Sequence, residues 1–255
     1  MARCESQGGH WPTGWSVGAV VTPDLLFFFD PVCPFAWMTS QWVRQVCAQR
    51  DYEVEWRFIS LRLLNAHVDY AAHFPPEYEA GHTDGLKLLR VTARLRAEHG
   101  PAAVGPFYQA LGTRIWETDQ DSTTRADRAV VVHVLTGLGL DPELADALEE
   151  HRWDAEIGAE GESALALTGR DVGTPILQFQ PPHGVAFFGP VISRLPRDED
   201  AVALWDHVVG LASFAGFAEL KRSLRELPQL PALGVDPDVA GVEQDWHAGS
   251  RRLKH

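Results

Sequence analysis

Cysteine, basic residues and long apolar runs are all scarce in this sequence. Only three of its 255 residues are cysteine, an odd number that excludes a fully paired set of intramolecular disulfides. Its 22 lysines and arginines face 35 acidic residues, which gives a formal net charge of -13. Because nucleic acids and acidic membrane surfaces bind through cationic side chains, we expect neither as a partner.

No segment approaches the roughly 20 apolar residues of a membrane-spanning helix. The first residues also lack the apolar core of a signal peptide. We therefore expect a cytoplasmic protein. The composition, 45% hydrophobic and 22% charged, is that of a globular chain long enough to bury a large core.

Cys33 is the most informative cysteine, because it lies between a strand signal and a helix signal. The apolar run 25–29 stops at Asp30 and Pro31, and Pro34 suits the first turn of a helix. A cysteine at a helix N-terminus faces unpaired N–H groups and the positive end of the helix dipole, which favour the thiolate. We therefore predict that Cys33 is the reactive residue, with a pKa well below the usual value of about 8.5. A buried, inert cysteine is the alternative.

Neither of the other cysteines suits Cys33 as a disulfide partner. Cys47 lies about 21 Å further along the predicted helix, at about 1.5 Å per residue. A disulfide needs Cα atoms within about 7 Å. Cys4 lies in a glycine-rich segment and reaches Cys33 only if that segment folds back.

The hydrophobic pattern predicts two α/β segments separated by a helical block. Strands at 24–30 and 52–61 flank a helix from Pro34 to Arg50, a βαβ unit whose crossover should be right-handed. The block is expected to hold helices at 76–98, 104–116, 123–138 and 142–153. Strand patterns return at 174–179 and 185–188, and helices are expected at 198–214 and 216–226.

Two halves of one sheet, divided by an insertion, explain this order, because each half alone is too small to bury a core. We predict an irregular leader over 1–22, a split α/β domain over 23–61 and 169–227, a helical insertion over 62–168 and a C-terminal tail over 228–255.

Several stretches together resemble DsbA-like thioredoxin-fold proteins with a helical insertion, and within them the mycothiol-dependent reductases or nitroreductases. The matching stretches are 29–34 (FDPVCP), 60–61 (SL), 64–65 (LN), 172–175 (VGTP), 185–191 (VAFFGPV), 193–194 (SR) and 196–197 (PR). The similarity covers about residues 24–228. It implies an α/β thioredoxin-like fold, βαβ and ββα, with a large all-helical insertion.

The resemblance makes Cys33 the nucleophile and places Pro34 and Phe35 at the helix opening. Ala36 departs from the family pattern, because redox-active relatives carry a second cysteine there. A dithiol enzyme resolves its mixed disulfide with that second thiol, and this chain has none at the position. An engineered cysteine-to-alanine replacement would look the same.

In this fold a cis proline usually faces the active thiol, and Pro175 occupies that place, so that the backbone of Thr174 would be exposed to a substrate. An ordinary trans proline is the alternative. Trp37, Ser60 and Asn65 are candidates for substrate binding, although Ser60 and Asn65 would equally suit a helix cap.

Three functions stay open. The first is a monothiol oxidoreductase whose Cys33 adduct is resolved by an external low-molecular-weight thiol, mycothiol by resemblance, acting as a cosubstrate and not as a bound cofactor. The second is non-redox covalent catalysis by Cys33, such as cis–trans isomerisation of a conjugated substrate or a thiol transfer. The third is a ligand-binding module with Phe35, Trp37, Phe187 and Phe188 along an apolar groove.

We expect a small-molecule substrate. We expect no bound metal, because the cysteines and histidines show no compact ligand spacing. The sequence leaves the identity of the substrate open, and it also leaves a homodimer open.

Overall fold

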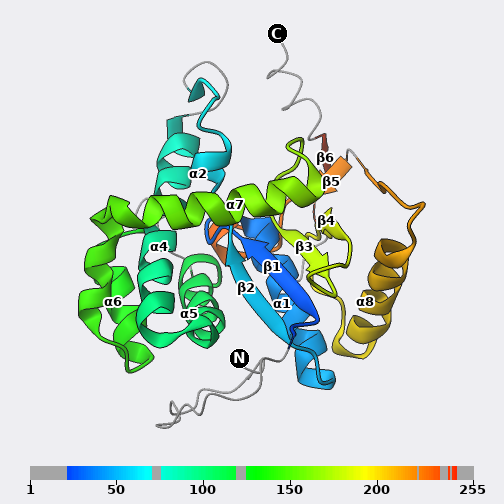
Figure 1. Ribbon diagram of the computed structural model, residues 1–255, viewed down its shortest axis with the longest axis horizontal. Coiled ribbons are helices and arrows are strands. Elements are labelled where there is room, and N and C mark those ends of the chain that lie inside the picture. Colours follow the sequence, from blue (N-terminus) through cyan, green and yellow to red (C-terminus); the bar gives the residue numbers. More distant parts are fainter. Residues whose placement is uncertain are drawn as a thin grey trace.

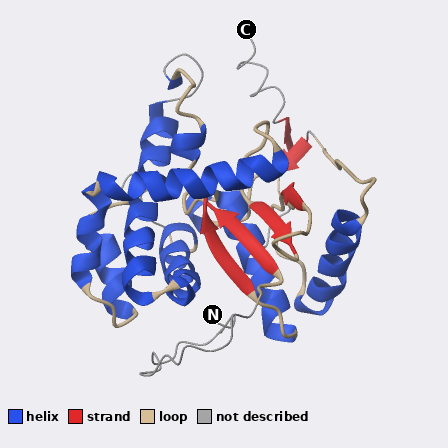
Figure 2. Ribbon diagram, in the orientation of Figure 1, coloured by secondary structure: helices blue, strands red, loops and turns tan. Residues whose placement is uncertain are grey.

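A four-stranded mixed sheet forms the centre of the molecule, in a computed structural model that describes residues 22–70, 76–118, 125–222, 224–235, 241 and 243–245. The strands are β1 (Leu25–Phe29), β2 (Val54–Phe58), β3 (Ile176–Phe179) and β4 (Ala186–Phe188), in the order β2-β1-β3-β4. β1 is parallel to β2 and antiparallel to β3, and β3 is antiparallel to β4. This is the predicted thioredoxin-like arrangement, and Figure 2 shows the sheet enclosed by helices.

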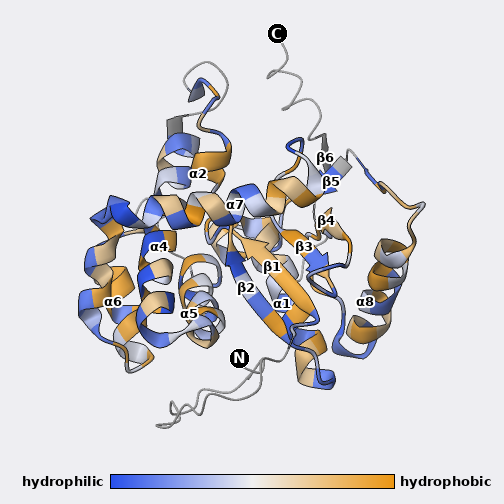
Figure 3. Ribbon diagram, in the orientation of Figure 1, coloured by the Kyte–Doolittle hydropathy of each residue, from blue (hydrophilic) through white to orange (hydrophobic). Residues whose placement is uncertain are grey.

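Strand β1 is apolar (Figure 3). It supplies side chains to cores on both faces of the sheet. Phe27 and Phe29 belong to the main core together with α1 (Pro34–Gln49), against which α8 (Asp198–Ser213) packs. Phe28 points to the opposite face and joins a smaller core that includes Leu165 of α7 (Asp154–Thr168). Figure 1 accordingly shows α7 in front of the sheet and α1 behind it.

The segment between β2 and β3 is helical, as predicted, but its inner boundaries differ. It contains α2 (Leu61–Leu64), α4 (Pro76–His99), η1 (Pro101–Ala103), α5 (Val104–Trp116), α6 (Arg128–Gly137), η3 (Pro142–Glu149), η4 (His151–Trp153) and α7. The helix predicted at 123–138 begins only at Arg128, where the Asp127 carboxylate caps it. The helix predicted at 142–153 is instead two 3₁₀ helices, η3 and η4.

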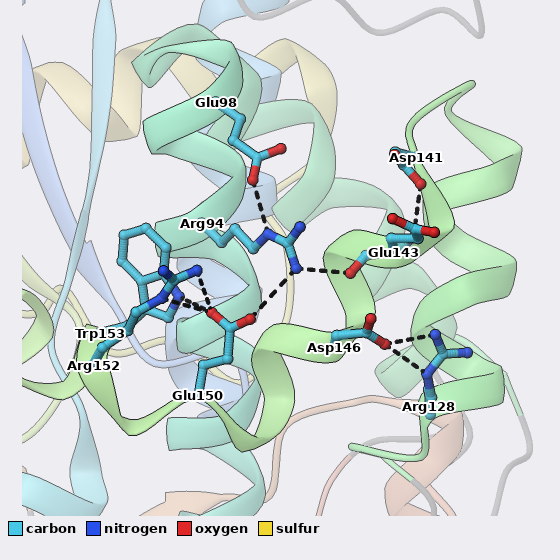
Figure 4. Close-up of polar contacts among 9 residues, drawn as sticks. All are labelled: Arg94, Glu98, Arg128, Asp141, Glu143, Asp146, Glu150, Arg152 and Trp153. Atoms are coloured by element: carbon cyan, nitrogen blue, oxygen red, sulfur yellow. Dashed lines mark hydrogen bonds and ion pairs between the residues drawn. The ribbon is translucent and has the colours of Figure 1, made fainter.

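Exposed ion pairs tie the helices of the insertion together on one side (Figure 4). Arg94 of α4 pairs with Glu98 of the same helix at 2.8 Å, and with Glu150, which lies between η3 and η4, at 3.6 Å. Arg128 of α6 pairs with Asp146 of η3 at 2.6 Å. Exposed pairs of this kind contribute little each, so apolar packing carries most of the stability of the insertion.

The C-terminal region differs most from the prediction. Residues 216–226 form no helix in their described part, and β5 (Leu224–Glu226) pairs antiparallel with β6 (Glu243–Asp245). Leu220 is 83% exposed, so a helix here would lack the apolar packing that short helices need. The predicted tail also contains η5 (Pro231–Leu233).

Residues 1–21, with Cys4 and nearly all of the predicted leader, lie outside the described residues. Within the described part, no helix is both long enough and apolar enough to cross a membrane.

Candidate active site around Cys33

Cys33 is the N-cap of α1 and lies just beyond the carboxyl end of the central strand β1. Its backbone N–H donates to the carbonyl of Asp30 at 3.0 Å, and its sulfur accepts the N–H of Ala36 at 3.4 Å. The thiol in turn donates to the backbone carbonyl of Thr174 at 3.3 Å. The sulfur therefore lies between the opening of α1 and the segment that leads into β3.

The Thr174–Pro175 peptide bond is cis, as the resemblance implied. The Thr174 hydroxyl donates to the carbonyl of Phe28 at 3.4 Å, and the Pro175 carbonyl accepts the N–H of Gly189 at 2.8 Å. These bonds hold Thr174 in place between β1 and β4. The structure thus brings together Cys33 and Thr174, which lie 141 positions apart in the sequence.

The pKa of Cys33 is raised in this structure, not lowered as the sequence predicts. Burial raises the pKa of Cys33 to about 12, and the charge of Asp30 adds to the rise, while the N–H groups of Ala36 and Phe35 oppose it. The helix N-terminus is present, but the loss of hydration outweighs it for a side chain that is only 7% exposed. The resting thiol is therefore neutral at pH 7 and needs a change in its surroundings before it ionises.

Asp30 is a site residue that the sequence pattern marks only as the end of a strand. Its carboxylate is fully buried and accepts the N–H of Val32 at 3.0 Å and the N–H of Leu61 at 2.7 Å. Burial raises the pKa of Asp30 to about 7, although both hydrogen bonds lower it. Helix α4 reaches this carboxylate at Gly85, where a Cβ atom would lie 2.4 Å from Oδ1 of Asp30. Asp30 therefore joins β1, the Cys33 loop and the insertion.

The residues after Cys33 pack inward. Pro34 is half-buried at the first position of α1, Phe35 is 8% exposed and Ala36 is fully buried. Trp37 is also fully buried, and its indole N–H donates to Glu117 at 2.7 Å. A substrate could contact Trp37 only if this side chain moved.

Ser60 and Asn65 serve as caps of the short helix α2. The Ser60 hydroxyl accepts the N–H of Leu63 at 3.4 Å, and the Asn65 side chain donates to the carbonyl of Leu61 at 3.0 Å. Because Leu61 also donates to Asp30, α2 begins beside the Cys33 loop. A substrate-binding role for these two residues stays a prediction.

The other aromatic candidates, Phe187 and Phe188, are half-buried on β4. Phe187 packs on Phe217 with ring centroids 5.7 Å apart, and Phe188 lies against Gly173. Among the described residues, no group of three or more His, Cys, Asp or Glu side chains is placed to hold a metal ion.

Comparison with known proteins assigns this chain to a family. Residues 32–222 match the model of a family described as Rv2466c-like, mycothiol-dependent nitroreductase Rv2466c. The chain belongs to the Rv2466c-like family. A curated relative, the uncharacterized protein Rv2286c of Mycobacterium tuberculosis, is 31% identical over 207 residues, which are 81% of this chain and 82% of the relative.

Two solved structures show a weaker likeness. The cytosolic disulfide reductase DsbM from Pseudomonas aeruginosa has a TM-score of 0.43 and 16% identity, over 74% of this chain and 99% of DsbM. The same protein with GSH has a TM-score of 0.46 and 13% identity, over 73% of this chain and 98% of DsbM. Similarity at this level adds nothing about function to the family match.

The family match includes Cys33 and Thr174 but ends at Arg222. The segment that forms β5, η5 and β6 therefore lies outside it.

Proposed function

We propose that this protein is a thiol-dependent oxidoreductase that works through the single thiol of Cys33 and uses a low-molecular-weight thiol, mycothiol, as its cosubstrate. The observation that carries the proposal is a buried thiol at the opening of α1, 3.3 Å from the Thr174 carbonyl, with a methyl group at position 36. Membership of a family described as mycothiol-dependent supports the choice of external thiol.

The proposed cycle has two thiol–disulfide exchanges. In the first, the Cys33 thiolate attacks one sulfur of a small disulfide, a sulfur–sulfur bond to Cys33 forms, and the other half leaves as a thiolate that takes up a proton. In the second, a mycothiol thiolate attacks the mixed disulfide and releases Cys33 as a thiolate. Mycothiol leaves joined to the second half of the substrate as a mixed disulfide. Exchange with a second mycothiol thiolate frees that half, so two mycothiols become one mycothiol disulfide for each substrate disulfide that is reduced to two thiols.

The chain's own residues serve these steps in distinct ways. The N–H of Ala36 faces the sulfur and stabilises the thiolate once the proton has gone. The Thr174 carbonyl, which accepts the thiol proton at rest, becomes free when the thiol ionises and offers a backbone acceptor to the incoming substrate. Nothing at position 36 can compete with the external thiol, so the mixed disulfide persists until that thiol arrives.

A second candidate is a ligand-binding module with a masked thiol. The raised pKa of Cys33 and its 7% exposure favour this candidate, because a neutral, covered thiol is a poor nucleophile. Non-redox covalent catalysis, an isomerase or a thiol transferase, would be recognised by product formed without any reductant. The cytoplasmic location and the homodimer stay predictions.

Trapping the adduct tests the proposal. After incubation with the symmetrical disulfide of mycothiol, intact mass should show one mycothiol unit bound, and peptide mass should locate it at Cys33. Added mycothiol should then remove it. Cys47→Ser serves as the matched control and should behave like the wild type, whereas Cys33→Ser should gain no adduct.

A Cys33 that stays unmodified over hours, while the protein still binds the disulfide, would favour the binding module. An adduct that mycothiol does not release would exclude mycothiol as the resolving thiol.

A further inference from the structure

The C-terminal segment 224–235, here called the C-terminal strap, is attached at one end to the loop that follows β4. The Glu226 carboxylate accepts the Ser193 hydroxyl at 2.9 Å and forms an ion pair with Arg194. The N–H of Gln229 donates to the Ser193 carbonyl at 2.7 Å. These two hydrogen bonds to Ser193, together with the ion pair between Arg194 and Glu226, fix this end of the strap.

The same loop is bound to the second turn of α1. The Thr39 hydroxyl donates to the carbonyl of Pro190 at 2.7 Å, three residues before Ser193. The first attachment of the strap therefore lies beside the helix that begins at Cys33.

The other end of the strap packs against α5, on a different side of α1. η5 contacts α5, and Leu230, just before η5, is only 1% exposed. α5 itself lies along the first turns of α1, because Gln109 bonds Gln41 at 2.9 Å and Gly112 lies against the ring of Trp37.

The strap therefore crosses the N-terminal half of α1. The inner side of α1 is occupied by the sheet, so a chain that joins these two attachments passes over the outer side. Leu230 belongs to the same core as Phe35 and Met38, which are 8% and 4% exposed.

We infer that the C-terminal strap determines substrate size, admitting small thiols and disulfides to Cys33 and excluding the disulfides of folded proteins. A protein substrate must lay an extended chain against the helix surface beside the thiol, whereas a small disulfide needs only to reach the sulfur. The strap occupies that surface, and it lies beyond residue 222, where the family match ends. The inference rests on the proposed reactivity of Cys33, but not on which thiol resolves its adduct.

Labelling with two maleimides of different size tests the strap. The rate of reaction at Cys33 is measured by peptide mass with N-ethylmaleimide and with a maleimide that carries a long polyethylene glycol chain. In Leu230→Ala, the ratio of the large-reagent rate to the small-reagent rate should rise about fivefold or more, because a loosened strap opens more often. Leu220→Ala, at an exposed leucine of the same region, should leave the ratio unchanged.

Glu226→Gln is a second variant that weakens the first attachment without opening a cavity, and circular dichroism checks that both variants fold. An unchanged ratio in both would overturn the inference. Equal acceleration of both reagents would also overturn it, since that result means a more reactive thiol and not wider access. If Cys33 reacts with maleimide but forms no adduct with the mycothiol disulfide, the proposed function fails while the strap test stands.

Discussion

Cys33 holds its proton because it is buried, and this gives its alkylation a characteristic pH dependence. With a pKa of about 12, the thiolate fraction grows about tenfold for each pH unit up to that value. We expect the rate of alkylation of Cys33 by iodoacetamide to rise throughout the range from about pH 7 to pH 10. A plateau at or below about pH 8.5 would contradict the burial argument and restore the thiolate that the sequence predicts.

Asp30 makes the stability of the protein depend on pH. Its pKa rises from 3.8 to about 7 on folding. A group with a raised folded-state pKa contributes stability that is complete below its unfolded pKa and is lost as the pH rises through its folded pKa. We therefore expect the free energy of unfolding, measured in urea, to fall between about pH 4 and pH 7 and then to level off.

Asp30→Asn should abolish this fall of the free energy of unfolding with rising pH. It should also destabilise the protein by about 1–3 kcal/mol, because the amide presents a donor to one of two backbone N–H groups. If the free energy of unfolding falls as steeply with pH in Asp30→Asn as in the wild type, other groups cause the pH dependence.

At the scale of elements, the close approach of α5 to α1 depends on Gly112. A Cβ atom there would lie 2.0 Å from Cζ3 of Trp37, so Gly112→Ala must displace the indole or separate the helices. We expect destabilisation by about 1–3 kcal/mol, the usual cost of overpacking. Gly137→Ala at the end of α6 is the control, since nothing lies within 4 Å of its Cβ position. Urea unfolding that shows equal effects for the two variants would contradict this reading of the interface.

The sequence predicts elements well where local chemistry and tertiary packing agree. β1 is a short apolar run that ends at Asp30, and α1 begins at Pro34, so both signals are local. α7 was not separately predicted, because Gly158 and Gly161 weaken a helix in isolation. In the structure α7 buries Ile157, Ala164 and Leu165, so tertiary packing stabilises a helix that propensity does not predict.

The whole molecule has one continuous main core, and we expect it to unfold in a single transition. That core contains Phe29 of β1 as well as Tyr108 of the insertion, whose rings stack at 3.9 Å. Glu160 of α7 accepts the N–H of Phe58 at 2.8 Å and pairs with Arg96 at 2.7 Å, which joins the insertion to the edge of the sheet. Tryptophan fluorescence and far-UV circular dichroism should give superimposable urea curves. Two separated midpoints would mean that the insertion is an independent domain.

The site could be predicted only in part. Cys33 and Pro175 carry recognisable local signals, and the structure brings Thr174 to the sulfur as the resemblance implied. The pKa of Cys33 could not be predicted, because it depends on burial by segments that are remote in sequence, such as the one that brings the Thr174 carbonyl to the thiol. Asp30 was missed as a site residue for the same reason, since its role appears only when Leu61 and Gly85 reach it.

We propose that one thiol of this protein reacts and that an external thiol must resolve its adduct. The most direct test is the stoichiometry of the reaction with an aromatic disulfide, dithiobis(nitrobenzoate), after subtraction of the signal of Cys33→Ser. We expect one released thionitrobenzoate per Cys33 and one that stays bound until mycothiol is added, whereas Ala36→Cys should release two and retain none. Two equivalents released by the wild type, with no retained adduct, would show a resolving cysteine within the chain and would overturn the single-thiol cycle.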